Sequence, residues 1–224
     1  IGIFIFLTAT LTALFQLLIQ KSVGWIDYYN LGLSWSPGIA AILTCLIIKK
    51  DISSLKWKWG NWHWIKEAYT YPIILGALIY IPIWVFGLGG NSFNFDTPNN
   101  WSEKAIGEGN ISALGTLLGL LVLMTLGTLK FLFTALGEEI GWRGFMVWEF
   151  KKVMSFQTMA IVTGLIWAAW HWPGFIIGAE TFPYERIIFF TLNAGPLGIV
   201  LAYIAIKSES LWPAAIMHAG LNMF

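Results

Sequence analysis

The sequence contains little charge. Only 11% of its 224 residues are charged, whereas a soluble globular domain carries about a quarter. The formal net charge of +1 gives no electrostatic basis for binding nucleic acid. Hydrophobic residues make up 57% of the chain, and the mean hydropathy is +0.69. The composition therefore predicts an integral membrane protein.

Cysteine is also nearly absent, and so are the common nucleophile motifs. Cys45 lies within an apolar run and has no second cysteine to pair with, so we interpret it as a small buried hydrophobe. The chain contains neither a G-x-S-x-G nor an H-E-x-x-H motif. No linker divides the sequence, and 1–224 is predicted to be a single domain. Ile1 and Phe224 both lie in apolar segments, so we expect truncation at both ends.

What the sequence does contain is a series of long apolar segments separated by short polar ones. A span of the bilayer needs about 20 apolar residues in a helix, and the 14 tryptophans suit rings at the two membrane interfaces. The predicted fold is an all-α bundle of about eight transmembrane helices, or seven if the segment 138–152 is re-entrant. The predicted helices are 1–20, 31–48, 69–90, 112–136, 138–152, 157–172, 186–207 and 211–224.

The basic residues predict an orientation in the membrane. The segment 49–66 holds five lysines and four tryptophans, as is typical of an interfacial segment. With eight crossings, the side of this segment carries six basic residues and the other side five. Only the density of lysines in 49–66 then favours a cytoplasmic location for this side. On that basis, the active site is predicted to face the cytoplasm.

The stretch 137–145 concentrates the charge of an otherwise apolar region. Each charged group in a bilayer costs at least ~2.5 kcal/mol, so an adjacent acidic pair is a candidate functional site. Glu139 and Arg143 are four residues apart on a helix and can form an ion pair on one face. Glu138 then points about 100° away. One carboxylate is neutralised, and the other is available for chemistry.

The positions of the histidines complete a candidate catalytic group. Folding 138–152 back on 157–172 about a turn near residue 154 brings Glu138 beside His171. His218 and Asn222 are four residues apart, on one face of the last helix. Glu138 and His171 could activate a water, while His218 and Asn222 could hold the oxyanion of a tetrahedral intermediate. The sequence therefore predicts hydrolysis of a carbonyl compound.

Other interpretations of the same residues remain open. A buried polar network that only joins helices would use similar side chains. A transporter with a proton relay would also place acidic residues and histidine inside the membrane, although no internal repeat supports it. Two histidines and a glutamate could hold zinc, but a glutamate and histidine pair activates water without metal, and we expect no cofactor.

Three motifs carry a family resemblance. Glu138-Glu139-x-x-x-Arg143, Trp167-x-x-x-His171 and His218-x-x-x-Asn222 resemble the signatures of the CPBP family of intramembrane proteases, in the family order. This family comprises CAAX proteases, ABI proteins and bacteriocin-processing enzymes, and includes the type II CAAX prenyl endopeptidases. The resemblance covers 138–222. Trp167 departs from the family, which usually has Phe there, and we expect it to be a wall residue.

The resemblance implies a membrane-embedded endopeptidase. Glu138 and His171 would activate water, His218 and Asn222 would form the oxyanion site, and Glu139 and Arg143 would be mainly structural. The prenyl-protein branch cleaves after a lipidated cysteine near a C-terminus, whereas bacterial members are linked to peptide maturation or to immunity against bacteriocins. The resemblance thus implies a peptide or lipidated-protein substrate within the membrane and leaves the choice between these branches open. Metal use is likewise undecided by the resemblance.

Overall fold

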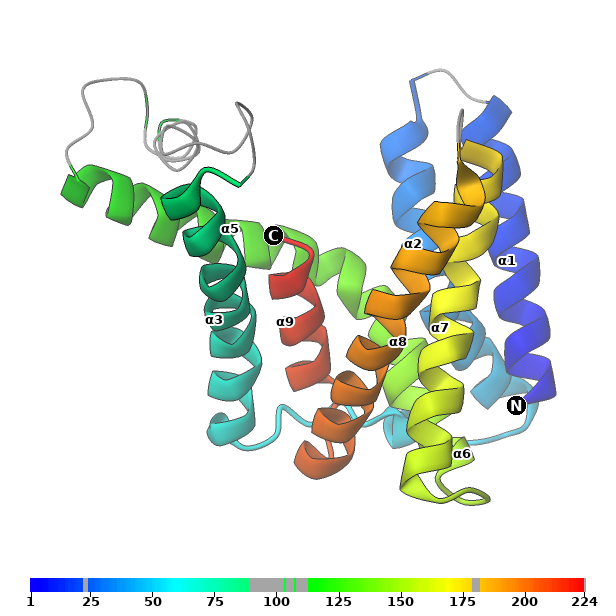
Figure 1. Ribbon diagram of the computed structural model, residues 1–224. Coiled ribbons are helices and arrows are strands. Elements are labelled where there is room, and N and C mark those ends of the chain that lie inside the picture. Colours follow the sequence, from blue (N-terminus) through cyan, green and yellow to red (C-terminus); the bar gives the residue numbers. More distant parts are fainter. Residues whose placement is uncertain (22–23, 89–102, 104–106, 108–112, 179–181, 224) are drawn as a thin grey trace.

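Helices form all the regular structure that the computed structural model describes, which is the chain without 22–23, 89–102, 104–106, 108–112, 179–181 and 224 (Figure 1). This confirms the predicted all-α class. The segment 91–110, between the predicted helices 69–90 and 112–136, lies almost entirely outside the described residues. The elements are α1 (Gly2–Lys21), α2 (Ile26–Ile47), η1 (Ile52–Leu55), α3 (Trp62–Phe86), α5 (Ala113–Glu139), η3 (Ile140–Met146), α6 (Val147–Phe150), α7 (Phe156–Gly178), α8 (Pro183–Ser208) and α9 (Trp212–Leu221).

Several of these helices are long and apolar enough to cross a membrane. Five qualify by length and composition: α1, α2, Leu118–Phe150, α7 and α8. They support the prediction of an integral membrane protein. Helix α9 has only 10 residues, a length of roughly 15 Å at 1.5 Å per residue, or about half of a hydrocarbon core. Helix α9, within the predicted last helix 211–224, is therefore not among the five.

The structure corrects the predicted break at Gly137. The segments 112–136 and 138–152 were expected to be separate helices, but α5, η3 and α6 form one continuous helical stretch. A glycine in a helix interior costs only about 1 kcal/mol, so it need not end a helix. In the π-helical turn η3, the backbone hydrogen bonds continue directly after the two glutamates. Such turns are frequent at functional sites. The expected count of eight crossings is therefore not confirmed.

Prolines inside helices explain other shifted boundaries. Pro37 and Pro72 were predicted near helix starts and Pro173 at a helix end, but all three lie inside α2, α3 and α7. A proline removes one backbone hydrogen bond. In a membrane the neighbouring helices compensate for this loss, whereas an unfolded backbone would leave many groups unpaired. The helices therefore continue through their prolines.

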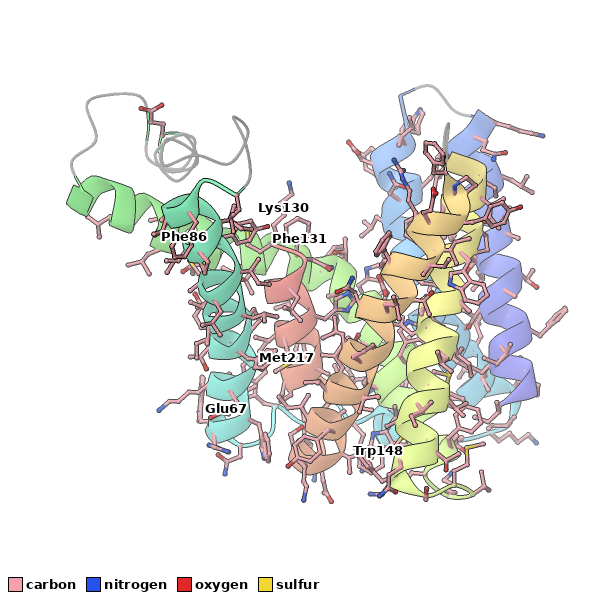
Figure 2. All side chains as sticks on the ribbon, viewed as in Figure 1. Glu67, Phe86, Lys130, Phe131, Trp148 and Met217 are labelled. Atoms are coloured by element: carbon pink, nitrogen blue, oxygen red, sulfur yellow. The ribbon has the colours of Figure 1, made fainter. Side chains whose placement is uncertain are left out.

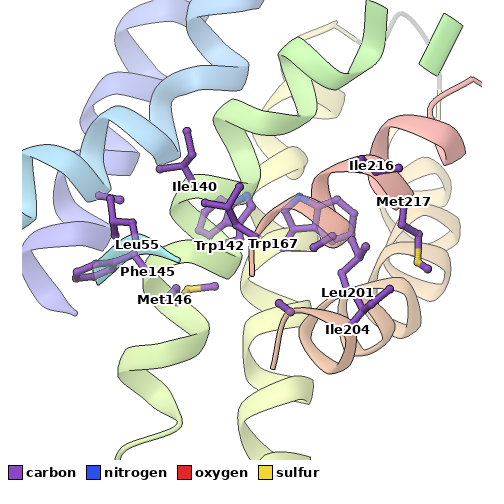
Figure 3. Close-up of a cluster of buried hydrophobic side chains, with 14 of the residues drawn as sticks. Leu55, Ile140, Trp142, Phe145, Met146, Trp167, Leu201, Ile204, Ile216 and Met217 are labelled. Carbon is purple, nitrogen blue, oxygen red and sulfur yellow. The ribbon is translucent and has the colours of Figure 1, made fainter. Parts of the chain in front are cut away.

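The acidic stretch is fixed by close packing on α2. A Cβ atom added to Gly141 would lie 2.5–2.6 Å from Pro37, including its backbone carbonyl, so only glycine permits this approach. Around it, η3 contributes Trp142, Phe145 and Met146 to the buried core. Figure 3 shows Trp142 and Trp167 at the centre of this cluster, with Leu55 on one side and Leu201 on the other.

The hairpin predicted around residue 154 is present. Helix α6 ends at Phe150, and α7 begins at Phe156 after Ser155, whose hydroxyl accepts a hydrogen bond from Thr158 N at 3.3 Å. Helix α7 then packs along α8. At their crossing, a Cβ atom on Gly198 would lie 2.5 Å from the Cα atom of Gly164. The small residues at this crossing thus permit close contact between α7 and α8.

Most basic residues gather at one end of the bundle. Because α5, η3 and α6 are continuous, the turn after α6 lies at the same end as η1, the start of α3 and the end of α8 (Figure 1). Lys21 and Arg186 lie at the opposite end. The lysines at the first end, which we call the basic end, are Lys49, Lys50, Lys56, Lys58, Lys66, Lys151, Lys152 and Lys207.

Candidate active site

The two adjacent glutamates lie at the junction of α5 and η3. Glu139 is fully buried, and its Oε1 atom accepts a hydrogen bond from Arg143 Nη1 at 2.6 Å. Arg143 is also buried, with 2% of its side chain exposed. The predicted ion pair four residues apart is therefore confirmed. Each charge compensates the other, which makes the burial of both tolerable in a low-dielectric interior.

Glu139 has a second partner that the sequence did not reveal. His218 Nδ1, from α9, donates to Glu139 Oε1 at 2.9 Å. Because a carboxylate only accepts hydrogen bonds when ionised, the Nδ1 atom carries the hydrogen. The Nε2 atom of His218 is then the nitrogen left to meet another group. His218 is 3% exposed, and it ties α9 to α5.

Glu138 points to a different neighbour. Its Oε2 atom accepts a hydrogen bond from the indole Nε1 of Trp167 at 2.9 Å, and its residue keeps 6% exposure. No second hydrogen bond to this carboxylate, from His171 or from any other side chain, is found in the described residues. The expected direct pairing of Glu138 with His171 is thus replaced by a bond to the residue one helical turn earlier. The arithmetic of the hairpin assumed regular α-helices, and the wider π-turn η3 changes that register.

His171 is held by the turn of α7 on which it sits. Its Nδ1 atom lies 2.9 Å from the carbonyl oxygen of Trp167. A carbonyl only accepts, so Nδ1 carries the hydrogen and Nε2 is the unprotonated nitrogen of the neutral ring. The ring centroid lies 4.7 Å from Trp170 and 4.5 Å from Phe190. Glu138 is close enough to interact electrostatically with His171.

Trp167 contacts every other member of the group except Asn222 and Glu139. Its ring centroid lies 5.6 Å from that of His171, 5.2 Å from that of His218 and 4.8 Å from the Arg143 guanidinium carbon. Sequence reasoning treated it as a wall residue and missed its hydrogen bond. The signal was its departure from Phe, because only the indole can donate to Glu138.

Asn222 lies apart from this group in the described structure. It follows α9 directly, one turn beyond His218, and its side chain is exposed. No hydrogen bond of its side chain is found among the described residues. The structure therefore brings Glu138, Glu139, Arg143, His171 and His218 around Trp167. The oxyanion role of Asn222 stays a prediction.

The expectation of no cofactor stays a prediction. Within the described residues, no group of three His, Cys, Asp or Glu side chains is arranged to hold a metal. His218 places Nδ1 on Glu139, and Glu138 Oε2 accepts from Trp167, so His218 Nε2 and Glu138 Oε1 are the atoms left to meet a water or another ligand. One oxygen does lack a donor in the described structure: Glu139 Oε2 is buried without a hydrogen-bond partner. A bound water is the usual way to satisfy such an atom.

Comparisons with known proteins agree with the motifs. Residues 120–224 match the family described as type II CAAX prenyl endopeptidase Rce1-like, which includes all three motifs and confirms the resemblance. A CAAX prenyl protease 2 of Methanococcus maripaludis is 28% identical over 100 residues, which cover 41% of this chain and 36% of that relative. The match thus spans about a third of the relative's length. No solved structure matches.

Proposed function

We propose, from the match of residues 120–224 to the Rce1-like prenyl endopeptidases, that this protein is a membrane-embedded endopeptidase. It would hydrolyse a peptide bond of a membrane-associated substrate with a water activated by Glu138 and His171. The contrast between the two glutamates carries the proposal. Glu139 Oε1 accepts hydrogen bonds from both Arg143 and His218, and no surface of Glu139 is exposed. Glu138 accepts a single hydrogen bond in the described structure, from Trp167, and keeps 6% exposure.

The water is activated on the Glu138 side. The Trp167 indole fixes Oε2, so Oε1 is the oxygen that would take the proton of a bound water. His171 Nε2, unprotonated in the neutral ring, would accept the second hydrogen of the same water and orient it. The water oxygen then attacks the carbonyl carbon of the scissile peptide bond.

The oxyanion is stabilised on the Glu139 side. His218 is anchored through Nδ1, and as an imidazolium its Nε2 would donate to the carbonyl oxygen that becomes negative. The positive charges of Arg143 and protonated His218 then equal the negative charges of Glu138 and Glu139, so the group as a whole is neutral. The proton held by Glu138 then passes to the leaving nitrogen, and the C–N bond breaks. Asn222 is proposed as a second oxyanion donor, at the exposed end of α9.

The depth of the group supports a substrate inside the membrane. Glu138 precedes Phe150 by 12 residues, a distance of roughly 18 Å along a helix at 1.5 Å per residue. If Phe150 lies near the membrane interface, the group would lie well inside a hydrocarbon core of about 30 Å. The name of the archaeal relative and the family favour a prenylated C-terminal peptide as substrate. A bacteriocin-like peptide is the alternative substrate class.

We also propose that the basic end faces the cytoplasm. It carries eight lysines, against Lys21 and Arg186 at the other end of the described structure, where Figure 2 also shows Lys130, and such asymmetry sets orientation in the membrane. A Lys151→Cys variant tests this proposal, because the only other cysteine, Cys45, is buried. A membrane-impermeant maleimide should label it only after the cells are permeabilised; labelling of intact cells would reverse the orientation.

The activity is tested with purified protein and a panel of peptides. The panel holds farnesylated, geranylgeranylated and unprenylated versions of one CAAX sequence, and mass spectrometry locates the cut. We expect cleavage after the prenylated cysteine and retention of activity after exhaustive chelation. Products that also appear with Glu138→Gln would be background and would refute the assignment. Loss of activity on chelation that only zinc restores would refute the metal-free mechanism.

A further inference from the structure

A second candidate site lies at the basic end, away from Glu138 and Glu139. A cleft of about 520 Å³ opens between the segment after α2 and the turn after α6. We call it the basic cleft. Figure 2 shows Trp148 at the same end of the molecule as Glu67, near the start of α3. The residues lining the cleft are Lys50, Ser54, Lys56, Trp148, Glu149, Lys151 and Lys152.

The charge of the basic cleft is positive. Its one acidic residue, Glu149, is already paired with Lys50 and with Lys152, the latter at 2.7 Å. Lys56 and Lys151 instead place their Nζ atoms 3.9 and 4.8 Å from the Trp148 ring centroid. Neither forms an ion pair with another described residue. These two lysines leave a net positive charge that an anion would balance.

Asp51, which is adjacent to Lys50 in the chain, does not change this balance. Asp51 is exposed, and its carboxylate accepts hydrogen bonds from the backbone nitrogen and the hydroxyl of Ser53 at 2.9 and 2.6 Å. These bonds hold the pKa of Asp51 below its usual value. Asp51 thus caps η1. It does not neutralise Lys56 or Lys151 by a direct ion pair in the described structure.

Two polar atoms in the lining residues lack partners. Ser54 Oγ and Trp148 Nε1 are both buried, and neither has a hydrogen-bond partner in the described structure. Buried polar atoms are normally satisfied, so each calls for a partner. Both can donate, as can the ammonium groups of Lys56 and Lys151. A ligand that fits must therefore be negative and rich in acceptors, as a phosphate group is.

The position of the cleft identifies the source of the phosphate. It lies at the ends of α2 and α6, which belong to stretches long enough to cross a membrane, so in a membrane it would lie near the lipid headgroups. Trp148 is the type of residue enriched at that interface. We propose that the basic cleft binds the phosphate of an anionic phospholipid headgroup. This site is independent of the proposed proteolysis, since it uses none of the residues around Trp167.

Binding of a short-chain lipid by the full chain in neutral detergent tests the site. The probes are dioctanoyl phosphatidylglycerol and, as the uncharged-headgroup comparison, dioctanoyl phosphatidylcholine. We expect Lys56→Gln/Lys151→Gln to weaken phosphatidylglycerol binding by about 30-fold, since each lysine near a membrane surface contributes about a factor of five. Lys58→Gln/Lys66→Gln removes the same charge from the same end but outside the cleft, and should change the affinity less than about threefold.

A third variant separates the cleft from diffuse charge and from folding defects. Ser54→Ala keeps every charge and should still weaken phosphatidylglycerol binding by about fivefold, the loss expected for one hydrogen bond. Equal losses in the two double-lysine variants, or equal binding of the two lipids, would overturn the site. Displacement of the lipid by millimolar inorganic phosphate would assign the cleft to a soluble phosphate and overturn the lipid proposal.

Discussion

The two adjacent glutamates face two different regions of the molecule. Glu139 points into a closed region, where Arg143 and His218 both donate to one of its oxygens and no surface is exposed. Glu138 points toward Trp167 and the half-buried His171, with one hydrogen bond and 6% exposure. Chain neighbours of the same type therefore have different surroundings, and we propose that Glu139 is structural while Glu138 activates the water.

The difference shows how a helical bundle makes a reactive carboxylate tolerable. The Glu139 ion pair is buried at a depth where an isolated charge costs several kcal/mol. Arg143 compensates Glu139 directly, and its guanidinium also stacks on Trp167, the donor to Glu138. Arg143 therefore links the region around Glu139 to the region around Glu138 through its contact with Trp167. Variants that separate the two regions are the best tests of this arrangement.

The largest effect on catalysis is expected for Glu138→Gln. Loss of a general base lowers turnover by about 10²–10⁴-fold, and the amide can still accept from Trp167, so the thermal stability in detergent should change little. Turnover of the cleaved peptide and the melting temperature measure the two effects. Wild-type turnover in this variant would show that Glu138 is not the base.

The closed region should respond in the opposite way. Arg143→Met leaves Glu139 as a buried charge without its main partner and should cost about 3–5 kcal/mol of stability. The double variant Glu139→Gln/Arg143→Met removes both charges and should recover a large part of that loss. Denaturation of the purified variants measures the recovery. Equal stability of the single variant and the wild type would contradict a structural role for the pair.

A smaller effect is expected for Trp167→Phe, which keeps a ring and removes the donor to Glu138. A lost hydrogen bond of about 1.4 kcal/mol corresponds to about a tenfold fall in kcat, with KM unchanged because the residue positions the base. Trp170→Phe is the matched control: its indole donates to Thr12 at 2.7 Å, between α7 and α1. It should lower stability slightly and leave kcat near the wild-type value. An unchanged kcat in Trp167→Phe would remove the positioning role.

Local periodicity accounts for the parts of the site that the sequence predicted correctly. Glu139 and Arg143 meet because they are four apart on one helix. The turn predicted near residue 154 is also present, where the Ser155 hydroxyl caps α7. Across the hairpin, Glu138 was predicted to lie beside His171. The two interact electrostatically, but the hydrogen bond of Glu138 goes to Trp167, one turn of α7 earlier. The hydrogen bond between His218 and Glu139 joins two residues that are 79 positions apart in the chain. No local sequence pattern indicates it.

Composition and motif spacing alone thus determined the membrane class, the all-α fold and the residue types of the site. Only the tertiary structure decided which histidine meets which glutamate, because that depends on the register between packed helices. It also decided the charge asymmetry. Continuity through Gly137 moves Lys151, Lys152 and Lys207 to the end that holds the lysines of 49–66. A glycine destabilises a helix by only about 1 kcal/mol. Its presence in the sequence therefore does not show whether the helix continues or ends there.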